Sequence, residues 1–158
     1  MRNIKNQQVI AELMDIDSLS FRAFAHATEN EERVKTAVIN ASGAEEVQCS
    51  KSYGYHGNPI IIIEAKITRS KEIKAMFNSL SAEDLQTLLA TLELRVDEES
   101  FFYMRLDKQE AYLGQIKLSN EEDVISVKGK IKSYPQNRDN ALQSITAILT
   151  ALLEKKEP

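Results

Sequence analysis

Several residue types are scarce in this sequence, and each scarcity excludes a class of protein. Cys49 is the only cysteine, so a disulfide within the chain is impossible, which fits a reducing cytoplasm. No apolar run approaches the roughly 18 residues that a membrane span needs, and the first residues lack the pattern of a signal peptide. We therefore expect a cytoplasmic protein without a membrane partner.

An excess of positive charge is missing as well. The 20 lysines and arginines are outnumbered by 24 aspartates and glutamates, which gives a net charge of -4. Such a charge provides no overall attraction to nucleic acid or to an anionic membrane. Any contact with nucleic acid must therefore come from a local basic patch.

The sequence also lacks the short motifs of the common catalytic sites. It contains no Walker-type phosphate loop and no HExxH, paired CxxC or GxSxG motif. Asp107 and Glu110 form a candidate carboxylate pair, but capping of a short helical turn is the commoner use of such an aspartate. Cys49, His26 and His56 lack the spacing of metal ligands. We expect a noncatalytic protein with no cofactor and no metal site.

The length and the apolar content of the chain fit one hydrophobic core. The 158 residues are enough for one domain and few for two, and no linker rich in proline or glycine divides them. We predict an N-terminal extension over residues 1–17 and a single domain over residues 18–158.

Hydrophobic periodicity divides this domain into short strands and amphipathic helices. Alternation and β-branched content predict strands at residues 18–26, 45–50, 60–68 and 101–106, and a hairpin that joins residues 115–118 to 124–133. Helical spacing predicts helices capped by Thr28, Ser70, Ser81 and Asn137, and one helical turn within residues 107–114. The core positions include Leu19, Phe21, Ala23 and Ala25 of the first strand and Val34, Ala37, Val38 and Ala41 of the first helix, which Gly43 ends. The irregular order favours an α+β fold of two layers, with one mainly antiparallel sheet and helices packed on one face.

The strand positions opposite the core are rich in basic and aromatic residues. An antiparallel sheet that helices cover on one side can leave its other face open. The residues expected there are Arg22, Phe24 and His26; Glu64 and Lys66; Phe101, Tyr103 and Arg105; and Lys128, Lys130 and Lys132. Cationic groups bind phosphates and flat rings stack on unpaired bases, so this composition is typical of a platform for single-stranded RNA.

Other interpretations of this face stay open. Alternating lysines are common on a solvated edge strand that resists aggregation. Phe101 and Tyr103 are equally compatible with a core position or with a contact between subunits. Ile60 and Ile62 share the outward side of their strand with Glu64, which indicates that part of the face is covered, for example in a homodimer.

The stretch "GYHGNP", residues 54 to 59, predicts a turn before a strand. Gly54 and Gly57 permit a positive φ, and Pro59 begins a strand at a position that needs no N–H. The turn itself does not require Tyr53, Tyr55 and His56, which are candidates for a base or phosphate contact, although a loop histidine with a partner in the chain is the commoner case.

Three stretches, "FRAFAHATENEERV", "GYHGNPIIIIEA" and "FFYMRLDKQEAYLG", resemble an archaeal family of predicted RNA-binding proteins described as related to exosome subunits. The resemblance runs from about Ser20 to the last helix. It implies an α+β fold like that of the large-subunit ribosomal protein L-five. The matching positions are His26, Ala27, Thr28 and Glu29; Gly54, His56, Gly57, Asn58 and Pro59; and Arg105, Asp107, Lys108, Gln109 and Ala111.

Two hypotheses follow. The first is a noncatalytic RNA-binding protein, an accessory to RNA processing or the exosome, whose partners are RNA and an RNA-processing complex. Its candidate RNA-binding residues are Arg22, Phe24, His26, His56, Tyr103, Arg105, Lys108, Lys128, Lys130 and Lys132. The second is a homo-oligomeric protein-interaction module that does not bind RNA directly.

Overall fold

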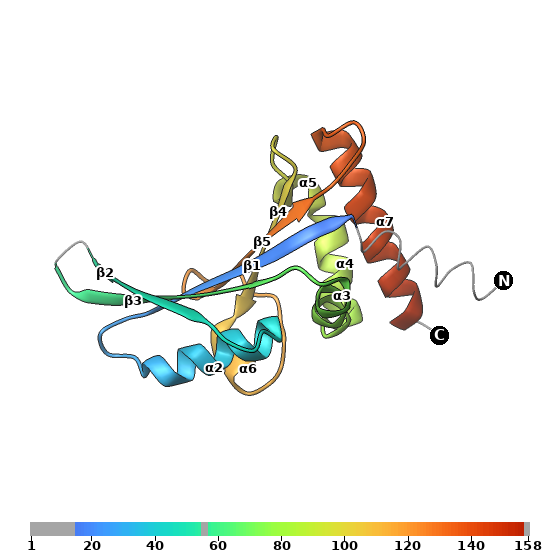
Figure 1. Ribbon diagram of the computed structural model, residues 1–158. Helices are drawn as coiled ribbons and strands as arrows, with labels where there is room; N and C mark the ends of the chain where they lie inside the picture. The colour runs from blue at the N-terminus through green and yellow to red at the C-terminus, as the bar shows by residue number, and fades with distance from the viewer. Residues whose placement is uncertain (1–14, 55–56, 157–158) are drawn as a thin grey trace. The chain divides into compact units, whose positions relative to one another are not determined.

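The computed structural model describes residues 15–54 and 57–156 (Figure 1). Five strands form one antiparallel sheet in the order β2-β3-β1-β5-β4. The strands are β1 (Ile16–Ala25), β2 (Gln48–Tyr53), β3 (Pro59–Ile67), β4 (Phe101–Asp107) and β5 (Val124–Ile131). The described helices are α2 (Glu31–Ser42), α3 (Ser70–Asn78), α4 (Ala82–Ala90), α5 (Leu92–Arg95), α6 (Lys108–Tyr112) and α7 (Arg138–Lys156). The predicted α+β class is confirmed.

The chain divides into two compact units. The first combines the described residues up to Leu19 with Thr68–Tyr103 and those from Lys128 onward, and the second combines Ser20–Ile67 with Met104–Val127. The prediction of one domain over residues 18–158 stays a prediction. The predicted extension falls mostly on residues 1–14, which lie outside the described part of the chain.

The first unit has a core made by α3, α4 and α7 together with strand residues. Figure 1 shows α7 beside α4, and both helices bury leucine and isoleucine side chains. Phe77 of α3 packs against Phe102 of β4 with 6.4 Å between the ring centroids. Burial of apolar side chains of this size is the main favourable term in folding.

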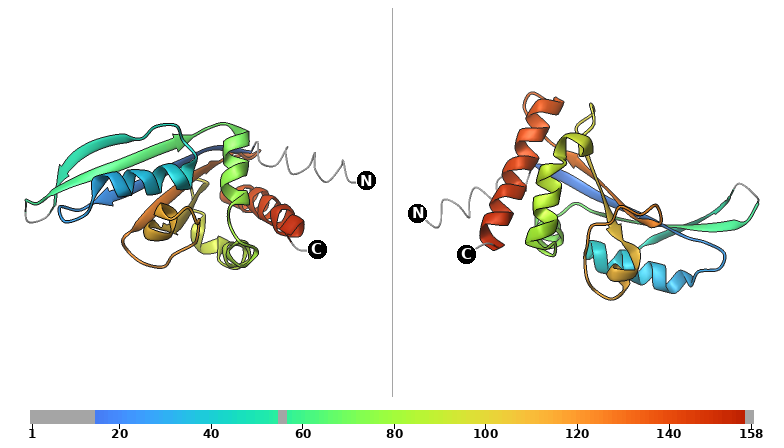
Figure 2. Two further views of the ribbon diagram at one scale, coloured as in Figure 1. Left: turned by 90° about the horizontal axis from the view of Figure 1, so that it is seen from below. Right: turned by 180° about the vertical axis from the view of Figure 1, so that it is seen from behind.

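The second unit has a core between α2, α6 and the neighbouring strands. The predicted stripe of α2, Val34, Ala37, Val38 and Ala41, is buried, and Gly43 ends the helix with φ 72° as expected. Helices α2 and α6 lie side by side in Figure 2. The amide of Asn40 fixes this contact by donating to the Ala111 carbonyl oxygen at 2.9 Å.

Burial alternates along the strands as the sequence predicts. In β1 the side chains of Leu19, Phe21, Ala23 and Ala25 are buried, while Arg22 and Phe24 between them are exposed. Strands β4 and β5 show the same alternation. Strands β1, β4 and β5 therefore each have one covered side and one open side.

Two of the four predicted helix caps are wrong. Asn30 rather than Thr28 caps α2, with its side-chain oxygen accepting from the N–H of Arg33, and α3 begins after Arg69 without a side-chain cap. Ser81 and Asn137 cap as predicted, by accepting from the N–H groups of Asp84 and Asn140.

The predicted hairpin between residues 115–118 and 124–133 is also wrong. Leu118 instead forms an isolated antiparallel bridge with Leu106, and the N–H of Ser119 donates to the carbonyl oxygen of Arg105. The segment after α6 therefore returns along the end of β4, where Leu106 is buried. No described helix is long and apolar enough to cross a membrane.

The turn between β2 and β3 is closed by backbone hydrogen bonds. The N–H of Gly54 donates to the carbonyl oxygen of Asn58, and the N–H of Gly57 donates to that of Gly54. Gly57 has φ 77°, a conformation that side chains with a Cβ rarely adopt. Tyr55 and His56 lie outside the described residues.

Gly57→Ala should lower the free energy of unfolding by about 1 kcal/mol, because alanine is strained at this φ. Gly57→Asn should cost less than Gly57→Ala, since asparagine tolerates the left-handed region better. Urea denaturation of the three proteins measures both differences. Equal stability of Gly57→Ala and the wild type would contradict the positive φ.

Candidate nucleic-acid interface

A row of three lysines follows the open side of β5 in the first unit. Lys128, Lys130 and Lys132 are exposed, while Gly129 and Ile131 between them are buried. The glycine has a packing reason, since a Cβ at this position would lie 2.9 Å from Cδ2 of Leu19. The predicted orientation of the three ammonium groups is therefore correct.

The lysine row lies next to two aromatic rings of β4. The ammonium of Lys128 is 4.1 Å from the centroid of the Phe101 ring and 5.8 Å from that of Tyr103. Both distances are in the range of a cation–π interaction. Tyr103 is 40% exposed, so its ring is not a core residue.

The Tyr103 ring is held in place by Asp97. The Tyr103 hydroxyl donates a hydrogen bond of 2.8 Å to the Asp97 carboxylate, and the N–H of Phe101 donates to the same carboxylate at 2.9 Å. Burial acts to raise the pKa of Asp97, but these hydrogen bonds and nearby Lys128 hold the pKa below its ordinary value. Burial and the bond to Asp97 raise the pKa of Tyr103, so the phenol stays neutral at neutral pH.

The other two lysines of the row differ in their partners. Lys132 forms an ion pair with Asp17 at 3.2 Å, and both side chains are about half exposed. Lys130 has no ion pair or hydrogen bond from its side chain among the described residues. An exposed ion pair contributes little, so Lys132 as well as Lys130 is available to an external phosphate.

The second unit has its own exposed basic and aromatic residues. Arg22 of β1 donates two hydrogen bonds to the Glu64 carboxylate of β3, at 3.2 and 3.0 Å. Phe24 is 39% exposed, and Arg105 donates to the carbonyl oxygen of Glu121 at 3.4 Å. Arg22 therefore has a carboxylate partner, whereas Arg105 bonds only to a neutral group among the described residues.

Lys108, one of the candidate RNA-binding residues of the sequence, is buried. Its side chain is only 9% exposed, and its ammonium lies 2.9 Å from Glu29, 2.8 Å from Asp123 and 3.0 Å from the carbonyl oxygen of Phe24. These three acceptors use the three N–H bonds of the ammonium. Lys108 is therefore a structural cation of the second unit, and we leave it out of the phosphate-binding set.

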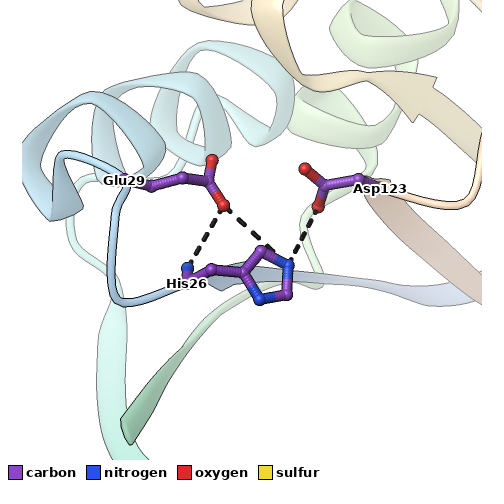
Figure 3. A group of neighbouring side chains, drawn as sticks. All are labelled: His26, Glu29 and Asp123. Atoms are coloured by element: carbon purple, nitrogen blue, oxygen red, sulfur yellow. Dashed lines mark hydrogen bonds and ion pairs between the residues drawn. The ribbon is translucent and has the colours of Figure 1, made fainter. Parts of the chain in front are cut away.

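His26 lies at the edge of the same cluster (Figure 3). Its Nε2 is 3.9 Å from Glu29 and 3.6 Å from Asp123, and its backbone N–H donates to Glu29 at 3.2 Å. One ligand atom from each of the three side chains falls within 4.8 Å of the others, which is close enough for a metal ion. Both carboxylates already neutralise Lys108, however, so a divalent cation would compete with an ammonium of the chain itself.

The sequence alone indicates no role for Asp97 or Asp123, and it marks Glu29 only as a position that matches the family. Asp97, Glu29 and Asp123 lie in the turns that flank the strands, outside the alternating pattern that marks the open side. The one signal in the sequence that could have identified these three residues is that each of them lies close to the end of a strand. Asp107 caps α6 as expected, by accepting from the N–H of Glu110 at 2.8 Å. His56 lies outside the described residues.

Lys108→Met should lower the free energy of unfolding by about 2 kcal/mol, because two carboxylates and a carbonyl oxygen lose their donor. Lys117→Met is the matched control, since Lys117 is exposed and its ion pair with Glu110 spans 3.8 Å. We expect the control to change stability by no more than about 0.5 kcal/mol. Urea denaturation followed by circular dichroism compares the two, and equal effects would contradict the structural role of Lys108.

Comparisons with known proteins place the chain in a family. Residues 18–131 match the family described as RNA binding. RNA-binding protein PAB1135 of Pyrococcus abyssi is 36% identical over 138 residues, which cover 81% of this chain and 90% of that protein. The crystal structure of AF2318 from Archaeglobus fulgidus has a TM-score of 0.75 at 35% identity and covers 84% of this chain and 99% of its own. Mth689 from Methanothermobacter thermautotrophicus, a DUF54 protein, has a TM-score of 0.75 at 30% identity, over 85% of this chain and 98% of its own. The match spans most of the sequence, and this chain belongs to the RNA-binding family.

Proposed function

We propose that this protein is a noncatalytic RNA-binding protein that uses the open side of its strands. The observation that supports this best is the lysine row, Lys128, Lys130 and Lys132, beside the half-buried ring of Phe101 and the exposed ring of Tyr103. Ammonium groups neutralise phosphates, and the rings offer faces on which unpaired bases stack.

The second unit adds a smaller contact of the same kind. Arg22, Phe24 and Arg105 are exposed there, and His26 stands beside two carboxylates. Glu64 pairs with Arg22, so an RNA phosphate must displace or share an ion pair whose side chains are about half exposed. Since exposed pairs contribute at most about 1 kcal/mol, this competition does not prevent binding.

The sequence also suggests a partner complex and a cellular compartment for this protein. We propose that the protein is an accessory of an RNA-processing complex such as the exosome, and that it acts in the cytoplasm. We also propose a fold like that of the ribosomal protein L-five, which the family resemblance implies and which would suit an RNA partner. The name of the Pyrococcus abyssi relative, an RNA-binding protein, agrees with the substrate class.

A homodimer without RNA is the second candidate function. Ile60 and Ile62 of β3 are partly exposed, and their neighbour β2 has mostly exposed side chains. A second copy of the chain covering these isoleucines would bury apolar surface. The mass of the protein in solution, measured with and without RNA, separates the two candidates.

Replacement of Lys128, Lys130 and Lys132 by glutamate should weaken binding to single-stranded RNA of every sequence. Each phosphate contact that is lost should also reduce the slope of log K against log salt by about 0.7. The matched control replaces Lys71, Lys74 and Lys155, which lie on helices α3 and α7 of the same unit, with the same change of charge. Fluorescence anisotropy of labelled RNA over a salt series measures both variants. Equal weakening in the two variants would mean that net charge, and not the lysine row, determines binding.

Tyr103→Ala should reduce RNA affinity by about 1 to 3 kcal/mol, because one stacking face is lost. Tyr103→Phe keeps the ring and removes only the hydroxyl that bonds to Asp97, so we expect a smaller loss. Tyr134→Ala is the control for removal of an exposed tyrosine, since Tyr134 is 95% exposed. An affinity that does not change in Tyr103→Ala would remove the ring from the proposed interface.

A further inference from the structure

A groove between α2 and α6 lies outside the strand residues that the proposed function uses. It has a volume of about 730 Å³, and its lining includes Thr28, Asn30, Arg33, Gln109 and Tyr112. All of these residues belong to the second unit. Sites for small molecules have volumes of about 300 to 1,000 Å³, so the groove is large enough for one nucleotide.

A planar cation and an aromatic ring stand together in this groove. The guanidinium carbon of Arg33 is 5.0 Å from the centroid of the Tyr112 ring. Both side chains are exposed, and within the described residues Arg33 has no carboxylate partner. Aromatic rings and guanidinium planes are the two surfaces on which proteins stack unpaired bases.

Polar groups along the groove are free to read the edge of a base. The side chains of Thr28 and Gln109 make no hydrogen bond within the described part of the chain. The side-chain oxygen of Asn30 caps α2, which leaves its amide N–H groups unused. An amide and a hydroxyl offer both donors and acceptors, as the edges of bases do.

The charge of the groove suits an anion. Glu29 lines the groove, and its carboxylate lies 2.9 Å from the ammonium of Lys108, which it shares with Asp123 outside the lining. Arg33 then remains as the cation of the lining without an acidic partner among the described residues. A ligand that joins a flat base to a phosphate matches this combination.

We propose that the groove between α2 and α6 binds a ribonucleoside monophosphate unit, with its base stacked on Tyr112 and its phosphate bound by Arg33. The unit is either a free nucleotide or an unstacked nucleotide of an RNA chain. This inference is independent of the lysine row, since a free nucleotide needs no contact with β5.

The test is a titration of the full chain with AMP, GMP, CMP and UMP, followed through backbone amide shifts in NMR spectra. The shifts should concentrate on α2 and α6 for at least one nucleotide. Ribose 5-phosphate, which lacks the base, should bind at least tenfold more weakly. Tyr112→Ala should raise the dissociation constant about 5- to 150-fold, the range for loss of one stacking face. Tyr134→Ala, which removes an exposed tyrosine of the first unit, should have no effect.

Gln109→Ala provides a second variant that does not depend on removal of a ring. It should change the preference among the four nucleotides without altering the fold, because Gln109 is exposed. Equal binding of ribose 5-phosphate, or shifts that avoid both helices, would overturn the inference, as would an affinity that neither variant changes.

The source of the nucleotide is settled by competition. Displacement of the bound monophosphate by single-stranded RNA identifies an RNA nucleotide as the natural occupant, and binding of both together identifies a free one. The variant with three glutamates on β5 should keep its nucleotide affinity. Loss of RNA binding in that variant with nucleotide binding retained shows that the groove and the lysine row are separate sites.

Discussion

The open side of the strands depends on the way that neighbouring side chains alternate. In β5 the buried Val127, Gly129 and Ile131 fix the register of the strand against the core. The lysines between them then have to point away from the core. A slip of one residue would bury the ammonium groups of Lys128 and Lys130 and expose the apolar side chains. The same contacts that stabilise the fold therefore place the charges that we assign to RNA.

Exposure decides which cations are available to an external phosphate. Lys132 and Arg22 are ion-paired, but their side chains are 53% and 56% exposed, so water screens these pairs. Lys108 has two carboxylates as well, yet its side chain is 9% exposed and its ammonium is fully used by the chain. A phosphate can replace the carboxylate partner of Lys132 or of Arg22 at little cost in free energy. Removal of the ammonium of Lys108, which is itself buried, would take away the donor that Glu29, Asp123 and the carbonyl oxygen of Phe24 share, which costs more.

Structural features that depend on residues close together in the sequence were predictable. Contacts between segments that are far apart in the sequence were not. The buried sides of β1 and α2 follow from apolar spacing within about ten residues. The place of Lys108 depends on Phe24, 84 residues away, and on Glu29, 79 residues away, so no local pattern contains it. The cap of α2 was misplaced because Thr28 and Asn30 are both good capping residues. The segment around Leu118 was misplaced because its partner, Leu106, lies across α6 rather than across the nearest turn.

The contact between Lys128 and the rings of β4 has a consequence for how RNA would bind. The ammonium lies 4.1 Å from the Phe101 centroid, where a stacked base would compete with it. An exposed cation–π contact contributes about 0.5 to 1 kcal/mol. Stacking of a base on an aromatic ring contributes about 1 to 3 kcal/mol. If RNA binds as proposed, this exchange would be favourable and would release the ammonium toward the phosphate that arrives with the base. Asp97 keeps Tyr103 in place during this exchange, because its hydrogen bond holds the hydroxyl of the ring.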